Sequence, residues 1–175
     1  AARVIRQEMK RALDEAGMTY RAAVITASNR SAAGLRPDTS GPILVEGLRD
    51  LGIDVGDPLV VPDGEPVGDA LRDAVESGID LVVTTGGTGL SPTDRTPEMT
   101  RLVIDREVPG LADAIRDHGT KHGIATAVLS RGIAGLAGRV LVINAPGSPG
   151  GCRDAIAALS PVLIHALDQI SGLDH

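Results

Sequence analysis

The chain of 175 residues has an average globular composition, with 42% hydrophobic and 23% charged residues, so extensive disorder is not expected. A formal net charge of −6 argues against nonspecific binding to nucleic acid or to a membrane surface. With one tyrosine and no phenylalanine or tryptophan, the chain lacks the aromatic faces of single-stranded nucleic-acid platforms, and its core must be aliphatic.

The hydrophobic pattern predicts strands and helices that alternate along the chain. The expected elements, in chain order, are a helix-capable lead-in over residues 1–19, a strand over 21–28, a helix over 41–51, an interrupted strand over 53–61, a helix over 66–76, a strand over 79–84, a helix from 97, a helix over 111–118, a strand over 138–144 and a last helix from 148. Residues 124–129 fit a helix or a strand equally well. Such alternation is typical of a three-layer α/β/α domain with a mostly parallel central sheet, and we expect residues 1–175 to form one such domain.

Capping residues mark the expected helix starts. Ser40 is expected to cap the first helix, and Thr96 the helix that begins at Pro97. Ser148 opens the last helix, which Pro161 is expected to kink or restart because its ring removes a backbone donor.

The most informative stretch begins at the last residue of the strand over 79–84 and continues into the turn that follows it. Residues 84–89 (TTGGTG) place three glycines within four positions, which allows a ligand to approach the backbone closely. An α/β sheet commonly binds anions at such a turn, although a glycine-rich turn can also be no more than a tight strand-to-helix connection. The added hydroxyl groups, the later Asp94 and the position after a buried strand favour an anion-binding loop.

Two aspartates are candidates for a metal site beside this loop. Asp94 could simply form an Asx turn, and Asp63 could simply cap the helix over 66–76. Both, however, are expected at the carboxyl edge of the sheet, next to amides that bind phosphate. Because Mg²⁺ binds through one or two carboxylates together with phosphate oxygens, the pair predicts a magnesium site.

Three other segments bear on anion binding. Arg131, between Ser130 and a glycine, suits phosphate contact, although the segment could be a plain loop. The turn over 146–149 (PGSP) opens a helix at another strand end, so it is a second candidate anion site. Glu107 is most simply interpreted as a solvated charge or as a residue at a helix end.

The order of these motifs resembles that of a known family. Residues 84–89, 94–98 (DRTPE), 106–110 (REVPG), 129–132 (LSRG) and 144–149 (NAPGSP) resemble the molybdenum cofactor biosynthesis proteins of the MogA/MoaB type. That family is also called molybdopterin adenylyltransferase and is related to the G domain of gephyrin. The resemblance covers residues 21–172, includes residues 38–41 (DTSG), and is more specific than one glycine loop because five motifs occur in order.

The resemblance implies transfer of AMP from ATP to the terminal phosphate of molybdopterin, with Mg²⁺, giving adenylyl-molybdopterin and pyrophosphate. It also implies a homotrimer, or a hexamer built from trimers, with a molybdate-insertion enzyme acting downstream. Asp63 and Asp94 would then be the catalytic and metal-binding residues. The substrate contacts that the family motifs imply are Ser28, Asn29, Arg30, Thr85, Gly86, Gly87, Thr88, Gly89, Thr96, Glu98, Glu107, Ser130, Arg131, Pro146, Gly147, Ser148 and Pro149.

The chain departs from the family pattern after the first strand. Many relatives have an aspartate where this chain has Asn29, between Ser28 and Arg30. Asparagine keeps an oxygen acceptor and loses the negative charge. The change is compatible with a weakly active or divergent paralogue.

Other functions compete with this interpretation. A protein of the same fold could bind molybdopterin without adenylylating it, and release of pyrophosphate from ATP would distinguish the two. A molybdate-insertion enzyme shares the fold but carries large additional domains, for which we expect no room in 175 residues. A nicotinamide-dependent oxidoreductase is disfavoured because no G-x-G-x-x-G follows the first strand.

Cysteine content and hydropathy bear on the compartment. Cys152 is the only cysteine, which excludes an intrachain disulfide framework and a cysteine-based zinc cluster. No apolar run approaches the ~20 residues that span a bilayer, and no N-terminal leader is recognisable. We therefore expect a cytoplasmic protein without membrane contact.

Overall fold

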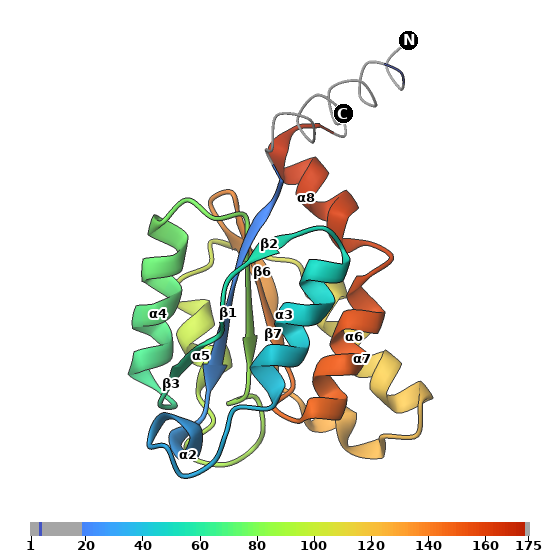
Figure 1. The fold of residues 1–175 in the computed structure, drawn as a ribbon. Helices are drawn as coiled ribbons and strands as arrows, with labels where there is room; N and C mark the ends of the chain where they lie inside the picture. Colours follow the sequence, from blue (N-terminus) through green and yellow to red (C-terminus); the bar gives the residue numbers. More distant parts are fainter. Residues whose placement is uncertain (1–3, 5–18, 174–175) are drawn as a thin grey trace.

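Figure 1 shows a central sheet with helices on both faces, in a computed structural model that describes residue 4 and residues 19–173. The sheet has seven strands in the order β2-β1-β4-β7-β6-β5, with β3 also paired to β1. The predicted α/β fold with a mostly parallel sheet is therefore confirmed. The lead-in predicted over 1–19 lies, except for residues 4 and 19, outside the described residues. Within the described part of the chain, no helix has both the length and the apolar character needed to cross a membrane.

Parallel pairing joins five strands, and antiparallel pairing adds two more at one edge. The parallel strands are β1 (Arg21–Ala27), β2 (Asp54–Val55), β3 (Leu59–Val61), β4 (Leu81–Thr85) and β7 (Val140–Ala145). The strand β6 (Ala134–Ala137) runs antiparallel to β7, and β5 (Arg106–Glu107) runs antiparallel to β6. The sequence does not predict these two, because their residues are few and lack β-branched side chains, and their strand conformation depends on pairing with β7.

Helices cover both faces of the sheet (Figure 1). One face carries α3 (Ser40–Asp50), α6 (Pro109–Lys121), α7 (Pro149–Leu159) and α8 (Leu163–Ser171), and the other carries α4 (Glu65–Glu76) and α5 (Thr96–Arg101). The short helix α2 (Asn29–Ala32) and the 3-10 helix η1 (Ala125–Leu129) belong to connecting segments. The undecided segment 124–129 is thus helical, and the predicted break of the last helix near Pro161 is confirmed. Each face has its own cluster of buried aliphatic side chains.

The predicted cap of α3 is wrong. Ser40 is the first residue of the helix, and its hydroxyl group donates a hydrogen bond to the Gly147 carbonyl at 2.8 Å. The side chain that holds the helix start is Asp38, whose Oδ1 accepts from the N–H groups of Ser40 at 3.2 Å and Gly41 at 3.0 Å. A tertiary partner therefore takes the hydroxyl that the sequence pattern assigns to capping.

The cap predicted for α5 is also wrong, whereas that of α7 is confirmed. Thr96 is the first residue of α5, and no side chain caps this helix. The Oγ of Ser148 accepts from the Gly151 N–H at 3.0 Å, as expected for the start of α7. Of the three predicted caps, therefore, only that of Ser148 forms the expected hydrogen bond.

Four of the five parallel strands, β1, β3, β4 and β7, end level with one another, whereas β2 pairs only with the beginning of β1. Thr26 pairs with Thr85, which pairs with Ala145, and Ala27 pairs with Val61. From β1 the chain enters α3 on one face, whereas from β3 it enters α4 on the other, so the direction of strand addition switches between β1 and β4. Ligands of open α/β sheets bind in the crevice at such a switch point, beyond the carboxyl ends of the strands. The register therefore gathers the loops after β1, β3, β4 and β7 at one candidate site.

Candidate functional site

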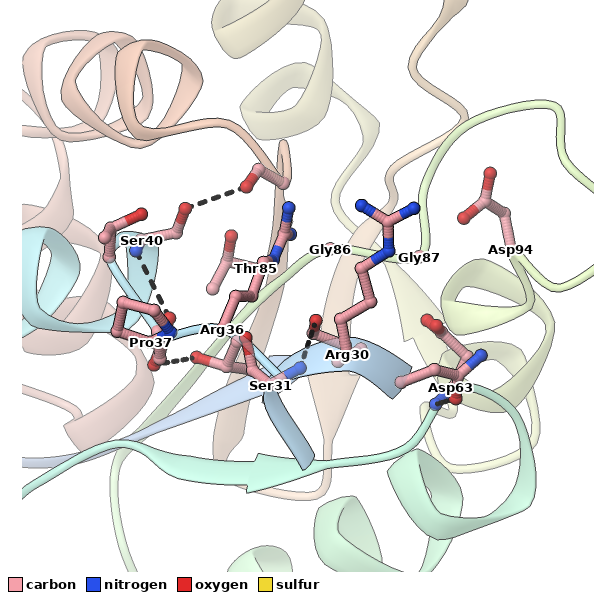
Figure 2. Close-up of a pocket in the computed structure, with 17 residues that line it drawn as sticks. Arg30, Ser31, Arg36, Pro37, Ser40, Asp63, Thr85, Gly86, Gly87 and Asp94 are labelled. Atoms are coloured by element: carbon pink, nitrogen blue, oxygen red, sulfur yellow. Dashed lines mark hydrogen bonds between the residues drawn. The ribbon is translucent and has the colours of Figure 1, made fainter. Parts of the chain in front are cut away.

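A cavity of about 420 Å³ opens at the switch point between β1 and β4 (Figure 2). Its walls come from the segment between β1 and α3, from the glycine loop after β4 and from Asp63, which lies just after β3. Nine of the predicted site residues line it: Ser28, Asn29, Arg30, Asp63, Thr85, Gly86, Gly87, Asp94 and Gly147. Segments that are far apart in the sequence thus meet at one place, as the parallel register requires.

A second cavity, of about 430 Å³, adjoins the first, and Gly87, Asp94 and Gly147 line both. The other predicted residues in its wall are Thr88, Gly89 and Ser130. A further cavity of about 390 Å³ between α6, η1 and the start of α7 includes Pro146 and Ser148. The glycine loop therefore lies between two neighbouring hollows that open at the carboxyl edge of the sheet.

The first two glycines of the loop are required by its conformation. Gly86 has φ +90°, and a Cβ atom there would overlap with the Ala27 carbonyl oxygen. Gly87 has φ +68°, and its Cβ would overlap with the Thr96 hydroxyl and lie 3.0 Å from Asp63 Oδ1. Side chains are thus excluded for two reasons, the left-handed backbone and the lack of space. The loop presents bare backbone toward the first cavity.

Asp63 has the most unusual environment among the acidic residues of the site. Its Oδ1 is buried and has no hydrogen-bond partner among the described residues. Burial raises the pKa of this carboxyl group, a hydrogen bond from the Asn29 backbone opposes the rise, and the charge of Asp94 adds to it. The helix that follows is preceded by Gly64 without a side-chain cap, so Asp63 does not serve as the cap that the sequence also allowed.

Asn29 supports Asp63 through a hydrogen bond. The Asp63 N–H donates to the Asn29 Oδ1 at 3.0 Å. An aspartate at position 29 would also accept this bond, but it would place another negative charge beside a carboxyl group that is already partly desolvated. Asparagine therefore keeps the contact and avoids the repulsion.

Asp94 combines the two roles that the sequence allowed. Its Oδ2 accepts from the Ser91 N–H at 2.9 Å, and its own N–H donates to the Ser91 carbonyl at 2.9 Å, so the turn is formed. The carboxylate nevertheless lines both adjoining cavities. Asp94 thus stabilises its own loop and still faces the site.

Two arginines give the first cavity a positive wall. Arg30 and Arg36 both line it, and in Figure 2 Arg30 lies between Arg36 on one side and Asp63 and Asp94 on the other. Arg36 is not among the site residues that the sequence motifs predict. Its presence with Arg30 in one polar loop directly after a strand was the available signal. A site with both charges suits a phosphate ester that arrives with a metal ion.

Arg131 lies outside the wall of the first cavity and contacts protein acceptors instead. Its guanidinium donates to the Gly89 carbonyl, the Asp94 carbonyl and the Glu98 carboxylate. The hydrogen bond from Arg131 holds the pKa of Glu98 below its usual range, and the partial burial of the carboxylate opposes this effect. Two predicted substrate contacts are therefore paired with each other across the loop that carries Asp94.

Three further predicted residues line none of these three cavities. Thr96 is only 1% exposed, and its hydroxyl lies behind Gly87 with no hydrogen-bond partner among the described residues. Glu107 is in β5 at the antiparallel edge of the sheet and forms an ion pair with Arg101. Pro149 is the first residue of α7. Their predicted contact with substrate therefore stays a prediction.

The donor set at the carboxyl edge fits a magnesium ion bound together with a phosphate. Within residue 4 and residues 19–173, no group of three or more His, Cys, Asp or Glu side chains could hold a metal by itself. Asp63 and Asp94 do share one cavity, and the buried Asp63 Oδ1 has no hydrogen-bond donor among the described residues. Mg²⁺ commonly uses one or two carboxylates and completes its octahedral shell with phosphate oxygens and water. These two carboxylates are therefore sufficient for that kind of site.

Comparison with protein families and known proteins gives one consistent result. A family model described as a probable molybdopterin binding domain matches residues 23–165. The molybdopterin adenylyltransferase of Helicobacter pylori strain J99 is 36% identical over 163 residues, which cover 88% of this chain and 89% of that protein. The solved structure of the molybdopterin biosynthesis Mog protein from Mycobacterium ulcerans is 52% identical, with a TM-score of 0.82 over 87% of this chain and 99% of that chain.

Longer relatives contain a matching region as one part. The molybdenum cofactor biosynthesis bifunctional protein of Chlorobaculum tepidum is 36% identical over 157 residues, which cover 89% of this chain and 50% of that protein. The chain therefore spans about half the length of this bifunctional relative.

Proposed function

Because the chain belongs to the MogA/MoaB-type family of molybdenum cofactor biosynthesis proteins, we propose that it is a nucleotidyltransferase that transfers AMP from ATP to molybdopterin. The products are adenylyl-molybdopterin and pyrophosphate. The observation that carries the proposal is the cavity between β1 and β4, where two arginines, two carboxylates and the glycine loop meet. The adjoining cavity beyond Gly87 supports a reaction between two substrates.

Adenylyl transfer joins two polyanions. A phosphate oxygen of molybdopterin forms a bond to the α-phosphorus of ATP, and the bond from that phosphorus to the oxygen bridging to the β-phosphorus breaks. Pyrophosphate leaves with the electron pair. This chemistry needs in-line positioning and neutralised charge more than a protein nucleophile. The only thiol fits that view, because Cys152 is fully buried and burial raises its pKa.

Each wall of the first cavity has a role in this reaction. Arg30 and Arg36 bind phosphate oxygens and offset the charge that develops on the leaving group. The backbone of Gly86 and Gly87 lets a phosphate approach more closely than side chains would allow. The residues that line both cavities, Gly87, Asp94 and Gly147, would hold the donor and the acceptor phosphate next to each other.

Asp63 and Asp94, which line the same cavity, would hold Mg²⁺ in this proposal through their carboxylate groups. The ion, when bound, supplies positive charge to the phosphate oxygens as a Lewis acid. Asn29 contributes by orienting Asp63, because the Asn29 side chain accepts a hydrogen bond from the Asp63 backbone N–H. The role of the protein is thus to bring two carboxylates and two guanidinium groups together in the cavity that would bind the reacting phosphates.

The test is incubation of the protein with ATP, Mg²⁺ and molybdopterin, followed by measurement of pyrophosphate and of adenylyl-molybdopterin. We expect both products in equal amounts and only when all three components are present. A protein that binds molybdopterin at equilibrium but releases no pyrophosphate would instead be the non-catalytic binding paralogue.

Arg36→Gln is expected to raise the KM for ATP about tenfold, because a charge-assisted hydrogen bond to phosphate is lost from a solvent-accessible site. The value of kcat is expected to fall less. The matched control is Arg139→Gln, in the exposed turn between β6 and β7, which removes the same charge far from the cavity. Steady-state kinetics with both variants at constant ionic strength provide the measurement. An unchanged KM in Arg36→Gln would contradict the role given to this residue.

The assembly and location belong to the same proposal. A homotrimer or a hexamer is supported by the family resemblance and by the exposed aliphatic side chains of Leu90 and Leu129 beside the second cavity. A molybdate-insertion enzyme is the expected downstream partner, since it would consume adenylyl-molybdopterin. The cytoplasmic location stays a prediction.

A further inference from the structure

Arg131 connects three points of the loop that carries Asp94. Its Nε donates to the Gly89 carbonyl at 2.9 Å, its Nη2 donates to the Asp94 carbonyl at 2.7 Å, and its Nη1 pairs with the Glu98 carboxylate. Its backbone N–H also donates to the Thr88 carbonyl at 2.8 Å. One residue therefore holds the loop before, at and after Asp94.

The loop has few other contacts that could fix its shape. Residues 90–93 are all exposed and belong to neither helix nor strand. The turn closes on itself through the two hydrogen bonds between Ser91 and Asp94. These bonds shape the turn, but they do not attach it to the rest of the protein. The position of the Asp94 carboxylate relative to Asp63 thus depends on the attachment that Arg131 provides.

Arg131 itself is firmly anchored. The Arg116 Nη1 donates to the Gly132 carbonyl at 2.8 Å, which ties the adjacent residue to α6. The Ile133 N–H donates to the Oδ1 of Asn144, a residue of β7 that is only 2% exposed. The segment that carries the guanidinium is therefore fixed to a helix and to a central strand, and it can transmit that rigidity to the loop.

The arrangement differs from that of an arginine that binds substrate. All three nitrogens of the Arg131 guanidinium already donate to protein oxygens, whereas Arg30 and Arg36 line the first cavity. The planar fork of a guanidinium can hold several acceptors in fixed directions, which an ammonium group cannot do. These three contacts therefore require the planar geometry of a guanidinium group as well as its positive charge.

We propose that Arg131 is a positioning residue that clamps the loop over residues 89–94 and thereby places the Asp94 carboxylate in the site. The proposal rests on the adenylyl-transfer function as far as catalysis is concerned. The clamp itself is a property of the folded protein and is measurable without substrate.

The first measurement is amide hydrogen exchange at Ser91 and Asp94, compared among the wild type, Arg131→Lys, Arg131→Gln and the control Arg139→Gln. We expect exchange about tenfold faster or more in both Arg131 variants, because the two charge-assisted hydrogen bonds that Arg131 donates to the carbonyls of the loop are lost. The control should match the wild type. Glu98→Gln retains the two carbonyl contacts of Arg131, so we expect a smaller acceleration and a variant that still folds if the Arg131 variants do not.

The second measurement separates positioning from phosphate binding. Arg131→Lys and Arg131→Gln should both lower kcat about tenfold or more and leave the affinity for inorganic pyrophosphate, measured without Mg²⁺, within twofold of the wild type. An arginine that binds phosphate would behave in the opposite way, with lysine retaining much of the function and glutamine weakening pyrophosphate binding.

Wild-type exchange rates at residues 91 and 94 in both Arg131 variants would overturn the clamp. So would a kcat in Arg131→Lys close to that of the wild type, together with reduced pyrophosphate affinity in Arg131→Gln. If the wild type itself produces no adenylyl-molybdopterin, the proposed function fails, and the exchange measurement still decides whether the clamp exists.

Discussion

Asp63→Asn is expected to lower kcat for the proposed adenylyl transfer roughly 100-fold or more, because it removes one of the two carboxylates that line the candidate site. The same variant is expected to be more stable than the wild type at pH 7. In the wild type the charged Asp63 carboxylate is partly desolvated, and one of its oxygens has no hydrogen-bond partner among the described residues. The residue thus lowers stability while it serves function.

The pH dependence follows from the raised pKa of Asp63. Folding favours the protonated form, so the wild type loses stability as the pH rises from the ordinary value near 3.8 through the raised value in the folded state. Asparagine does not titrate, so the stability of Asp63→Asn does not decrease in this way as the pH rises. Its melting temperature should exceed that of the wild type at pH 7, and the difference should disappear below pH 3.8.

The control for this variant is Asp57→Asn, in the exposed connection between β2 and β3. It makes the same chemical change and should affect neither turnover nor the melting temperature. Asp94→Asn should lose activity to a similar extent as Asp63→Asn, since the two carboxylates act together. Turnover close to the wild type in either site variant would refute the assignment. A melting temperature of Asp63→Asn that is lower at pH 7 would refute the electrostatic explanation.

Gly86→Ala is expected to lower the free energy of unfolding by about 3 kcal/mol, which corresponds to a melting temperature about 6–12 °C lower for a chain of this size. The backbone of Gly86 has φ +90°, and a methyl group would overlap with the Ala27 carbonyl oxygen of the neighbouring strand. Neither β1 nor β4 can yield easily, because both are central strands whose side chains are mostly buried. The loop would have to move, and the phosphate site with it.

The variant Gly78→Ala separates the two causes of this loss of stability, steric overlap and backbone strain. Gly78 has φ +77° at the end of α4, and no described atom lies within 4 Å of a Cβ placed there. Strain alone should cost about 1 kcal/mol in this control. Chemical denaturation of both variants measures the difference. Equal losses of stability in the two variants would show that the Ala27 carbonyl does not restrict the loop.

The sequence predicts those parts of the fold that depend on local pattern. The continuous apolar runs of β1, β4 and β7 and the apolar stripe of α4 are confirmed, since a buried parallel strand and an amphipathic helix each have a recognisable period. Asp63 and Asp94 lie in one cavity as expected, because the carboxyl ends of parallel strands lie at one edge.

Features that depend on distant partners are not predicted. Ser40 and Thr96 look like helix caps, but the Ser40 hydroxyl meets the carbonyl of a turn more than 100 residues away, and the Thr96 hydroxyl is enclosed behind Gly87. Arg131 likewise suggests phosphate binding by its charge, and only the folded chain reveals the three acceptors around it. For Arg36, the sequence gives no sign of a role in the site other than its position in the polar loop after the first strand.

The level ending of the parallel strands limits how the site can be redesigned. Thr26, Thr85 and Ala145 lie side by side on neighbouring strands, which in any sheet are about 4.8 Å apart. The first atoms of the three loops therefore start within roughly 10 Å of each other, a width set by backbone hydrogen bonds and independent of the side chains. Substitutions at this edge can change how tightly a ligand is held. A ligand of different length would be accommodated only by insertions or deletions in the loops themselves.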